Sequence, residues 1–305
     1  MPGLTLAESI SLRPVLPVAQ RSMKQTVVNM ILGFPQLFLD NVPIWSQFEY
    51  AKAMFPTVAL VELGYYEALD AAVKGDPNLL PDPSAFGNQY SQVLAGLRGL
   101  QAQVIATTIP NPLDTAYFST PAVAAQITAT NSFVITAGYK VEPQDYVTRN
   151  ALMTIANQFS NGEIGTLPAG SILRAATATA LTTRINALNA AIVNAAKANG
   201  AQVYDLNAFL RKIRVSGATA GNNTITADYL GGFYSMDAVY PGPTGHSLIA
   251  NDLITFLNQT YSTSFPLVNV TTVAAEDQTL RSLKPKGIEY TLESLRVVGG
   301  GEIVQ

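Results

Sequence analysis

The residues most able to do chemistry in this chain lie between positions 235 and 246. Ser235 supplies a hydroxyl, Asp237 a carboxylate, and His246 is the sole histidine of the sequence. A serine hydroxyl becomes a nucleophile when a neighbouring base accepts its proton, and His246 is the one ordinary base here for neutral pH. Ser235 lacks the sharp strand-to-helix turn typical of a nucleophile, so a substitute nucleophile there is the weaker interpretation.

The same segment resembles the last sequence block of the SGNH (GDSL-type) ester hydrolases. That block runs Asp-x-x-His-Pro, followed by Gly-His or Gly-Tyr at the start of the final helix. Here Asp237, Pro241 and Gly245 keep their places. The resemblance implies that Asp237 is the acid of the site, that Tyr240 replaces the catalytic histidine, and that His246 has a structural role. The alternative, in which His246 serves as the base, stays open.

Two earlier segments extend this resemblance, which covers most of residues 1 to about 260. Gly3 matches the family's oxyanion-hole glycine. Gly64 begins the block that reads Gly-x-Asn-Asp in the family, with Tyr66 in place of the asparagine and Glu67 in place of the aspartate. Tyr66 could donate a hydrogen bond to an oxyanion, whereas Glu67 would oppose one, so we expect Glu67 to face away and cap the helix that follows. The block with the nucleophilic serine, Gly-Asp-Ser-Leu, does not occur in the sequence.

The first residues suggest a hypothesis about the gene. The family's oxyanion block commonly reads Val-Pro-Gly, and this chain begins Met1-Pro2-Gly3. A bacterial GTG valine codon that is read as a start would give this substitution. We therefore expect the native gene to begin upstream with two further strands, and a stop codon shortly before Met1 would refute this. The extension would restore only the serine, because Tyr66 and Tyr240 would remain.

Three short apolar runs must position these residues. Residues 57–63, 103–109 and 201–206 are each almost continuously apolar, which is typical of strands buried in a parallel sheet. Apolar residues at helical spacing lie between or after them, at 90–97, 181–192 and 248–257. Strands that alternate with helices predict an α/β protein, a three-layer α/β/α fold of SGNH or flavodoxin-like type with a parallel sheet. This sheet would lack the family's first strands.

The predicted organisation is one large domain with an appendage. Residues 1–262 form the SGNH-hydrolase-like domain, and 263–305 a C-terminal arm or hairpin. Residues 111–176 are a long insertion after the strand at 103–109, and we expect them to cap a ligand crevice. The family's sheet order places the strand at 57–63 centrally. Without its neighbours this strand exposes an edge, which we expect the N-terminal fifty residues or a second copy of the chain to cover.

Composition excludes several classes of site. The chain of 305 residues has no cysteine, which excludes disulfides, thiolate nucleophiles and cysteine-bound metals. A net charge of −3 with no basic run gives no case for nucleic acid or an anionic membrane. No apolar run reaches the ~18 residues of a membrane span, and the N-terminus lacks the pattern of a signal peptide. Low charge with many Thr and Asn favours an extracytoplasmic bacterial location, and no cofactor is expected.

Two function classes follow. The first is a weak or unconventional carboxylic-ester hydrolase for small acyl, aryl or polyester substrates. The second is a non-catalytic descendant that serves as a binding or structural module. In either case a small ester or a carbohydrate-like molecule is the expected ligand. Covalent labelling of a nucleophile would separate the two classes.

Overall fold

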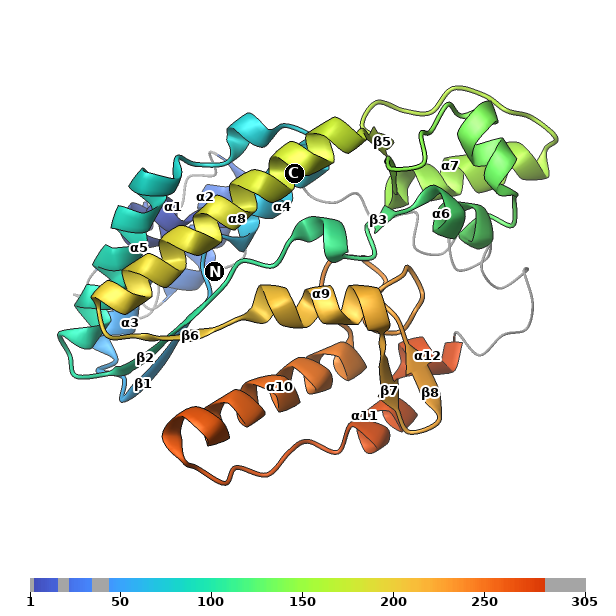
Figure 1. The fold of residues 1–305 in the computed structure, drawn as a ribbon. Coiled ribbons are helices and arrows are strands. Elements are labelled where there is room, and N and C mark those ends of the chain that lie inside the picture. The colour runs from blue at the N-terminus through green and yellow to red at the C-terminus, as the bar shows by residue number, and fades with distance from the viewer. Residues whose placement is uncertain (1–2, 16–21, 35–43, 283–305) are drawn as a thin grey trace. The chain divides into compact units, whose positions relative to one another are not determined.

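The computed structural model describes residues 3–15, 22–34 and 44–282. The protein is of mixed α/β type (Figure 1). Its chain divides into two compact units. The first unit contains Met1–Ala71, Asn78–Ile109 and Thr183–Leu206, and the second contains Ala72–Pro77, Pro110–Thr182 and Asn207–Gln305. Helices α4 (Tyr65–Lys74) and α8 (Ala175–Ala198) have residues in both units.

A three-stranded parallel sheet lies in the first unit. Strands β1 (Val58–Val61), β2 (Gln103–Thr107) and β6 (Gln202–Tyr204) run in the order β1-β2-β6. The middle strand is buried along all but its first residue, as its continuous apolar run predicts. The three predicted strands and the α/β class are therefore confirmed. The three-layer arrangement of the SGNH type stays a prediction.

Strand β1 forms one edge of this sheet. Its side chains alternate between the two faces, and Val58 and Leu60 on one face are 59% and 49% exposed. Helices α1 (Leu6–Ser11) and α3 (Gln47–Ala53) pack against each other and against helix α5 (Pro83–Arg98). The described N-terminal residues, which include α2 (Met23–Leu32), thus leave one face of β1 half-exposed.

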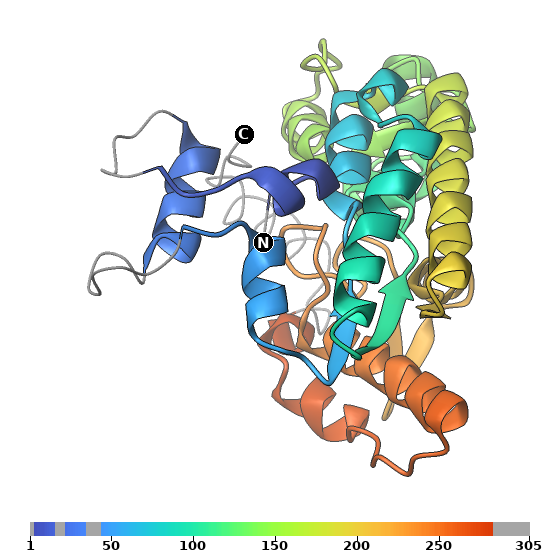
Figure 2. The ribbon, with the colours of Figure 1, turned by 90° about the vertical axis from the view of Figure 1, so that its left-hand side faces the viewer.

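Two long helices, α5 and the part of α8 that lies in the first unit, pack side by side (Figure 2). Helix α5 (Pro83–Arg98) begins at Asp82, whose carboxylate accepts the amides of Ser84 and Ala85. Gly87 of α5 lies so near α8 that a Cβ there would lie 3.2 Å from the Cβ of Ala191. The predicted stripes of both helices are buried: Tyr90, Val93, Leu94 and Leu97 on α5, and Leu181, Ile185, Leu188 and Ile192 on α8. A short helix, η2 (Pro77–Leu79), precedes α5.

The predicted insertion forms a small substructure in the second unit. Short helix η3 (Pro112–Asp114) leads into strand β3 (Phe118–Ser119), which pairs antiparallel with β4 (Tyr146–Thr148). Strand β4 pairs in turn with β5 (Ile172–Leu173). Helix α6 (Pro121–Ile127), the π-helix η4 (Val134–Gly138) and α7 (Arg149–Ser160) lie between the strands in sequence. Whether the insertion caps a crevice stays a prediction.

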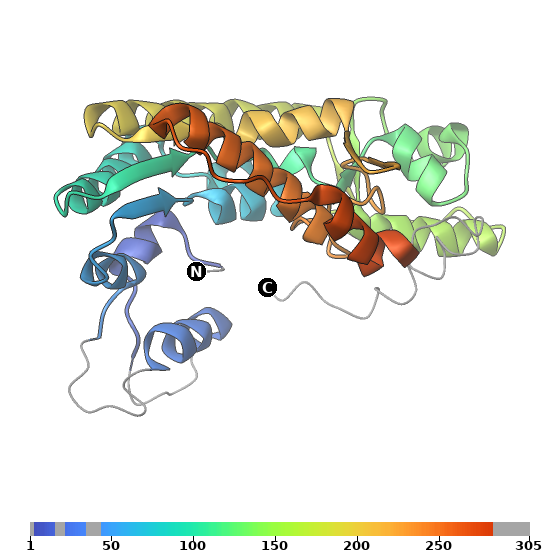
Figure 3. The same ribbon diagram turned by 90° about the horizontal axis from the view of Figure 1, so that it is seen from below.

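The rest of the second unit is a hairpin followed by helices. Helix α9 (Leu206–Ser216) leads to strands β7 (Ala218–Ala220) and β8 (Asn223–Ile225), which pair antiparallel. Helix α10 (Pro243–Tyr261) then precedes α11 (Val270–Glu276) and α12 (Gln278–Ser282) (Figure 3). The chain folds back along α10, since the side chain of Asn251 bonds both backbone groups of Val268. Residues 263–282 of the predicted arm contain helices and no strand, and residues 283–305 lie outside the described residues.

Candidate functional site

A tight turn carries the chain from β1 into α4 in the first unit. Gly64 makes this turn with φ +100°, a backbone conformation that side-chain-bearing residues rarely adopt. A Cβ at Gly64 would also lie 2.7 Å from Cδ1 of Ile109 and 2.8 Å from Cζ of Phe86. Glycine is therefore required here. The turn places Tyr66 and Glu67 in the first helical turn of α4, after the carboxyl end of β1.

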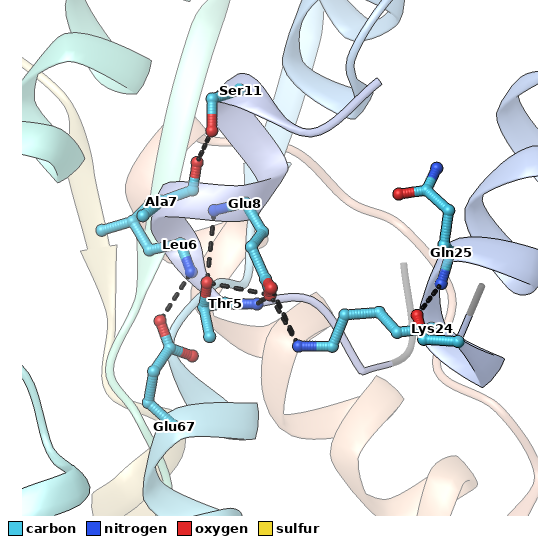
Figure 4. Close-up of polar contacts among 9 residues, drawn as sticks. Thr5, Leu6, Ala7, Glu8, Ser11, Lys24, Gln25 and Glu67 are labelled. Atoms are coloured by element: carbon cyan, nitrogen blue, oxygen red, sulfur yellow. Dashed lines mark hydrogen bonds and ion pairs between the residues drawn. The ribbon is translucent and has the colours of Figure 1, made fainter. Parts of the chain in front are cut away.

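Glu67 joins α4 to the N-terminal helix α1. Its side chain is buried, and its Oε1 accepts the amide hydrogen of Leu6 at 2.6 Å (Figure 4). Leu6 is the first residue of α1, where backbone amides have no partner within the helix. The backbone amide of Glu67 itself, in the first turn of α4, also bonds this carboxylate, in line with the expected cap of the helix that follows. The carboxylate additionally caps α1, a helix earlier in the sequence.

Charged neighbours surround this carboxylate. Burial raises the pKa of Glu67, and the nearby carboxylate of Glu8 adds to the rise. The amides of Leu6 and of Glu67 itself and the ammonium group of Lys24 act in the opposite direction. Oε2 of Glu67 is buried and has no hydrogen-bond partner among the described residues. The group is thus a desolvated acid with one of its two oxygens bonded.

Glu8 and Lys24 complete the cluster. Glu8 forms a capping box with Thr5, since its Oε2 accepts the amide of Thr5 at 2.9 Å and its own amide donates to the Thr5 hydroxyl. Lys24 Nζ donates to both carboxylate oxygens of Glu8, at 2.9 and 3.0 Å, and lies 5.3 Å from the ring centroid of Tyr66. Burial alone would raise the pKa of Glu8, but the bonds from Thr5 and Lys24 lower it below its usual value.

These contacts differ from those of an oxyanion hole. Such a hole needs hydrogen-bond donors aimed at a developing negative charge. Gly3 has φ +75° and open space around it, but the nearby side chains of Glu8 and Glu67 are acceptors. Lys24 is engaged by Glu8 and by the face of Tyr66. The group as built can hold α1 onto α4, and it offers an oxyanion little stabilisation.

The segment with Asp237 forms a closed turn in the second unit. Oδ1 of Asp237 accepts the amides of Val239 at 2.8 Å and Tyr240 at 2.9 Å. The amide of Ser235 donates to the carbonyl of Tyr240 at 2.8 Å, which closes the turn. Ala238, at φ +67°, adopts a left-handed conformation at its tip. Asp237 therefore organises the backbone of the turn, and the turn presents Tyr240, with 49% of this residue exposed.

His246 lies on the first turn of α10. Its amide donates to the carbonyl of Gly242 at 2.8 Å, and its side chain is exposed. Among the described residues, its imidazole has no hydrogen bond to Asp237 or to Ser235. The start of α10 is capped instead by Asp277, whose Oδ2 accepts the amide and the hydroxyl of Thr244 at 3.1 and 2.7 Å.

Asp277 is a residue that sequence reasoning missed. It is buried between α11 and α12, and no local sequence pattern connects it with a helix 34 positions earlier. Burial by itself would raise the pKa of Asp277, but hydrogen bonds from Thr244 and Thr279 lower it below the usual value. The carboxylate is thus held in its charged form at the positive end of a helix.

A second buried acid was also missed. Asp114 follows β2 in η3 and forms an ion pair with Arg211 at 3.1 Å. Burial raises the pKa of Asp114, and the guanidinium groups of Arg211 and Arg214 oppose this rise. The hydroxyl of Tyr234 donates to the backbone carbonyl of Asp114 at 3.4 Å. These contacts tie α9 and the segment before the Asp237 turn to the start of the insertion.

The predicted site residues thus fall into two groups. Gly64, Tyr66 and Glu67 come together with the N-terminal segment that contains Gly3 in the first unit, and Ser235, Asp237, Tyr240 and His246 follow one another in the second. Sequence spacing did not reveal the Leu6 and Asp277 contacts, which join residues far apart in the chain.

The described residues contain no cluster of three or more acidic or histidine side chains that could hold a metal ion. Their helices are also all too short or too polar to cross a bilayer. Comparison of the chain with protein-family models, with curated proteins and with solved structures found no match. The assignment of function therefore depends on the sequence resemblance and on the geometry of the two groups.

Proposed function

We propose that this chain is a non-catalytic descendant of the SGNH ester hydrolases and acts as a binding or structural module. In this proposal the positions that would carry catalysis now stabilise the fold. The resemblance of residues 1 to about 260 supports the lineage, and the contacts of the candidate residues support the loss of activity.

The single observation that carries the proposal is that the Asp237 turn holds a tyrosine, and no histidine, beside the Asp237 carboxylate. Its two backbone bonds to Oδ1 hold residue 240 beside the carboxylate, where a catalytic base would be oriented. Residue 240 is a tyrosine, and a phenol does not accept a proton as an imidazole does, so it cannot replace a histidine base. His246, the sole histidine, has an exposed side chain that does not bond Asp237. A serine placed near this turn would have no partner to accept its proton.

A weak or unconventional ester hydrolase is the second candidate, and one observation favours it. Glu67 is a buried carboxylate with a raised pKa and an unbonded Oε2. Such a group has the properties of a general base, because its affinity for a proton is higher than that of an ordinary carboxylate. Glu67 would then activate water in place of the missing serine and histidine.

Hydrolysis of p-nitrophenyl acetate by the purified protein tests both candidates. The non-catalytic proposal predicts no release of p-nitrophenol above the buffer rate, for the unchanged protein and for Ser235→Ala, Asp237→Ala and His246→Ala alike. The second candidate predicts a measurable rate that falls in Glu67→Gln. Its pH profile would rise to a plateau around a pKa above that of an ordinary glutamate.

A residual rate needs a control for contamination. Glu163→Gln removes one exposed carboxylate and retains both groups of candidate residues. A rate that is equal in Glu67→Gln, Glu163→Gln and the three alanine variants would come from a contaminant and would agree with the non-catalytic proposal. A rate lost in one of the four site variants, but kept in Glu163→Gln, would overturn it.

A further inference from the structure

A hollow in the second unit has the charge and shape of a ligand site. It lies between the residues that follow the π-helix η4 and the segment from Gly165 to Arg174 around β5, and its volume is about 400 Å³. Ligand sites in proteins are commonly hollows of roughly 300–1,000 Å³. The hollow can therefore hold a molecule of about monosaccharide size.

The lining of this hollow is cationic. Lys140 and Arg174 contribute to its wall, and none of the other residues that line it carries a charge. A smaller hollow of about 230 Å³ shares Arg174, adds Lys74, and has no acidic residue in its wall either. Asp145, which lines neither hollow, pairs with one nitrogen of Arg174. The two cationic side chains in the wall of the larger hollow favour an anionic ligand.

The guanidinium group of Arg174 is fixed in position. Its Nη1 donates to Oδ2 of Asp145 at 2.7 Å and to the backbone carbonyl of Lys140 at 2.9 Å. Asp145 is itself buried and fixed, because it also accepts the amides of Glu142 and Ala175. One nitrogen of Arg174 thus makes both contacts with the protein.

The other edge of this guanidinium is available. Nε and Nη2 of Arg174 have no hydrogen-bond partner among the described residues, and the side chain is half-exposed. These two nitrogens form the edge that binds a carboxylate or a phosphate through two parallel hydrogen bonds. Because the bonds of Nη1 already orient the guanidinium group, binding an anion at its other edge costs less side-chain entropy.

Lys140 brings the second cation. It follows the end of η4, and its backbone at φ +56° has the left-handed conformation in which helices commonly end. Its carbonyl accepts a hydrogen bond from Nη1 of Arg174, and Lys140 is an exposed residue that lines the hollow.

We propose that this hollow binds a small organic molecule through an oxyanion group, a carboxylate or a phosphate monoester, held on Nε and Nη2 of Arg174 with Lys140 as a second cation. The rest of the ligand lies against the glycine-rich backbone and the ring of Pro168. This site is separate from the catalytic positions, so it does not depend on whether the chain hydrolyses esters.

Calorimetric titration of the full chain with three probes tests the site: D-glucuronate, glucose 6-phosphate and neutral glucose. We expect one or both anions to bind with 1:1 stoichiometry and glucose to give no saturable signal. Arg174→Lys keeps the charge but not the two-pronged edge, and should raise the dissociation constant about tenfold, the ratio for one lost charged hydrogen bond. Lys140→Gln should raise it about two- to fivefold.

Lys212→Gln is the matched control, because it removes one exposed positive charge of α9 in the same unit and lines neither hollow. It should leave binding unchanged. The proposal is overturned if neither anion binds, if glucose binds as well as the anions, or if Arg174→Lys binds like the unchanged protein. It is also overturned if Lys212→Gln weakens binding as much as Lys140→Gln. The melting temperature of each variant shows that the fold is retained.

Discussion

Replacement of Glu67 gives a sharp test of the role that the structure assigns to it. In Glu67→Gln the amide carbonyl can still accept the Leu6 amide hydrogen, but no charge has to be buried. In Glu67→Ala the acceptor is lost and the first amide of α1 is left buried without a partner. An unsatisfied buried donor costs about 1–3 kcal/mol. We therefore expect Ala to destabilise the protein by about this amount and Gln to leave it equally or more stable at neutral pH.

The pH dependence separates these variants further. A group whose pKa is raised in the folded state stabilises the protein below its unfolded pKa, and this stabilisation is lost as pH rises through the folded pKa. The unchanged protein should therefore lose stability relative to Glu67→Gln as pH increases from about 4 towards 8. Groups present in both proteins largely cancel in this difference.

Urea denaturation followed by tryptophan fluorescence is a suitable assay. Trp45 is the sole tryptophan and lies in the first unit, 5.4 Å from the ring of Tyr50 on α3. Because helix α3 packs against α1, the fluorescence emission of Trp45 reports on the unfolding of the region in which Glu67 bonds α1. The reasoning would be refuted if Glu67→Gln and Glu67→Ala lost the same free energy of unfolding at pH 7. It would also be refuted if the difference in this free energy between Glu67→Gln and the unchanged protein did not vary with pH.

Three further predictions follow from the same contacts. Gly64→Ala should destabilise the protein by more than about 2 kcal/mol, because the new Cβ clashes with Ile109 and Phe86 and the positive φ is unfavourable for alanine. Gly162 also has a positive φ but open space around it, so Gly162→Ala should cost less in the same urea titration. Asp277→Ala should remove the cap of α10 at a cost of about 0.5–2 kcal/mol at pH 7. Because the pKa of Asp277 is lowered in the folded protein, this stabilisation is lost as pH falls through the folded pKa, and melts at low pH should show a smaller difference. The half-exposed face of β1 should be covered in solution, so light scattering should show association or amides 58–61 should exchange slowly; a monomer with rapid exchange there would contradict this.

The central elements of the fold could be predicted because they depend on local patterns. The apolar run at 103–109 gives β2, since a strand buried on both faces needs apolar residues without interruption. The stripe at 181–192 gives α8 because its spacing matches one helix face. The short strands β3, β4 and β5 could not be predicted, because two or three residues carry no detectable alternation.

The candidate site was harder to predict because its contacts are long-range. Glu67 bonds Leu6, which is 61 positions earlier, and Asp277 bonds Thr244, which is 33 positions away. No local rule pairs such residues, so the sequence indicated a cap of the helix that follows Glu67 and did not reveal its bond to α1. The Asp237 turn is a local motif, an aspartate that accepts amides two and three residues ahead, but the sequence analysis assigned Asp237 only as the acid of the site.

The most direct test of the non-catalytic assignment is covalent labelling with a fluorophosphonate, mapped by mass spectrometry. This reagent modifies a serine that a neighbouring base activates. With an active serine esterase in the same mixture as a positive control, we predict that the control is labelled and this chain is not, at Ser235 or elsewhere. A single adduct that is lost in Asp237→Ala or His246→Ala would contradict the assignment.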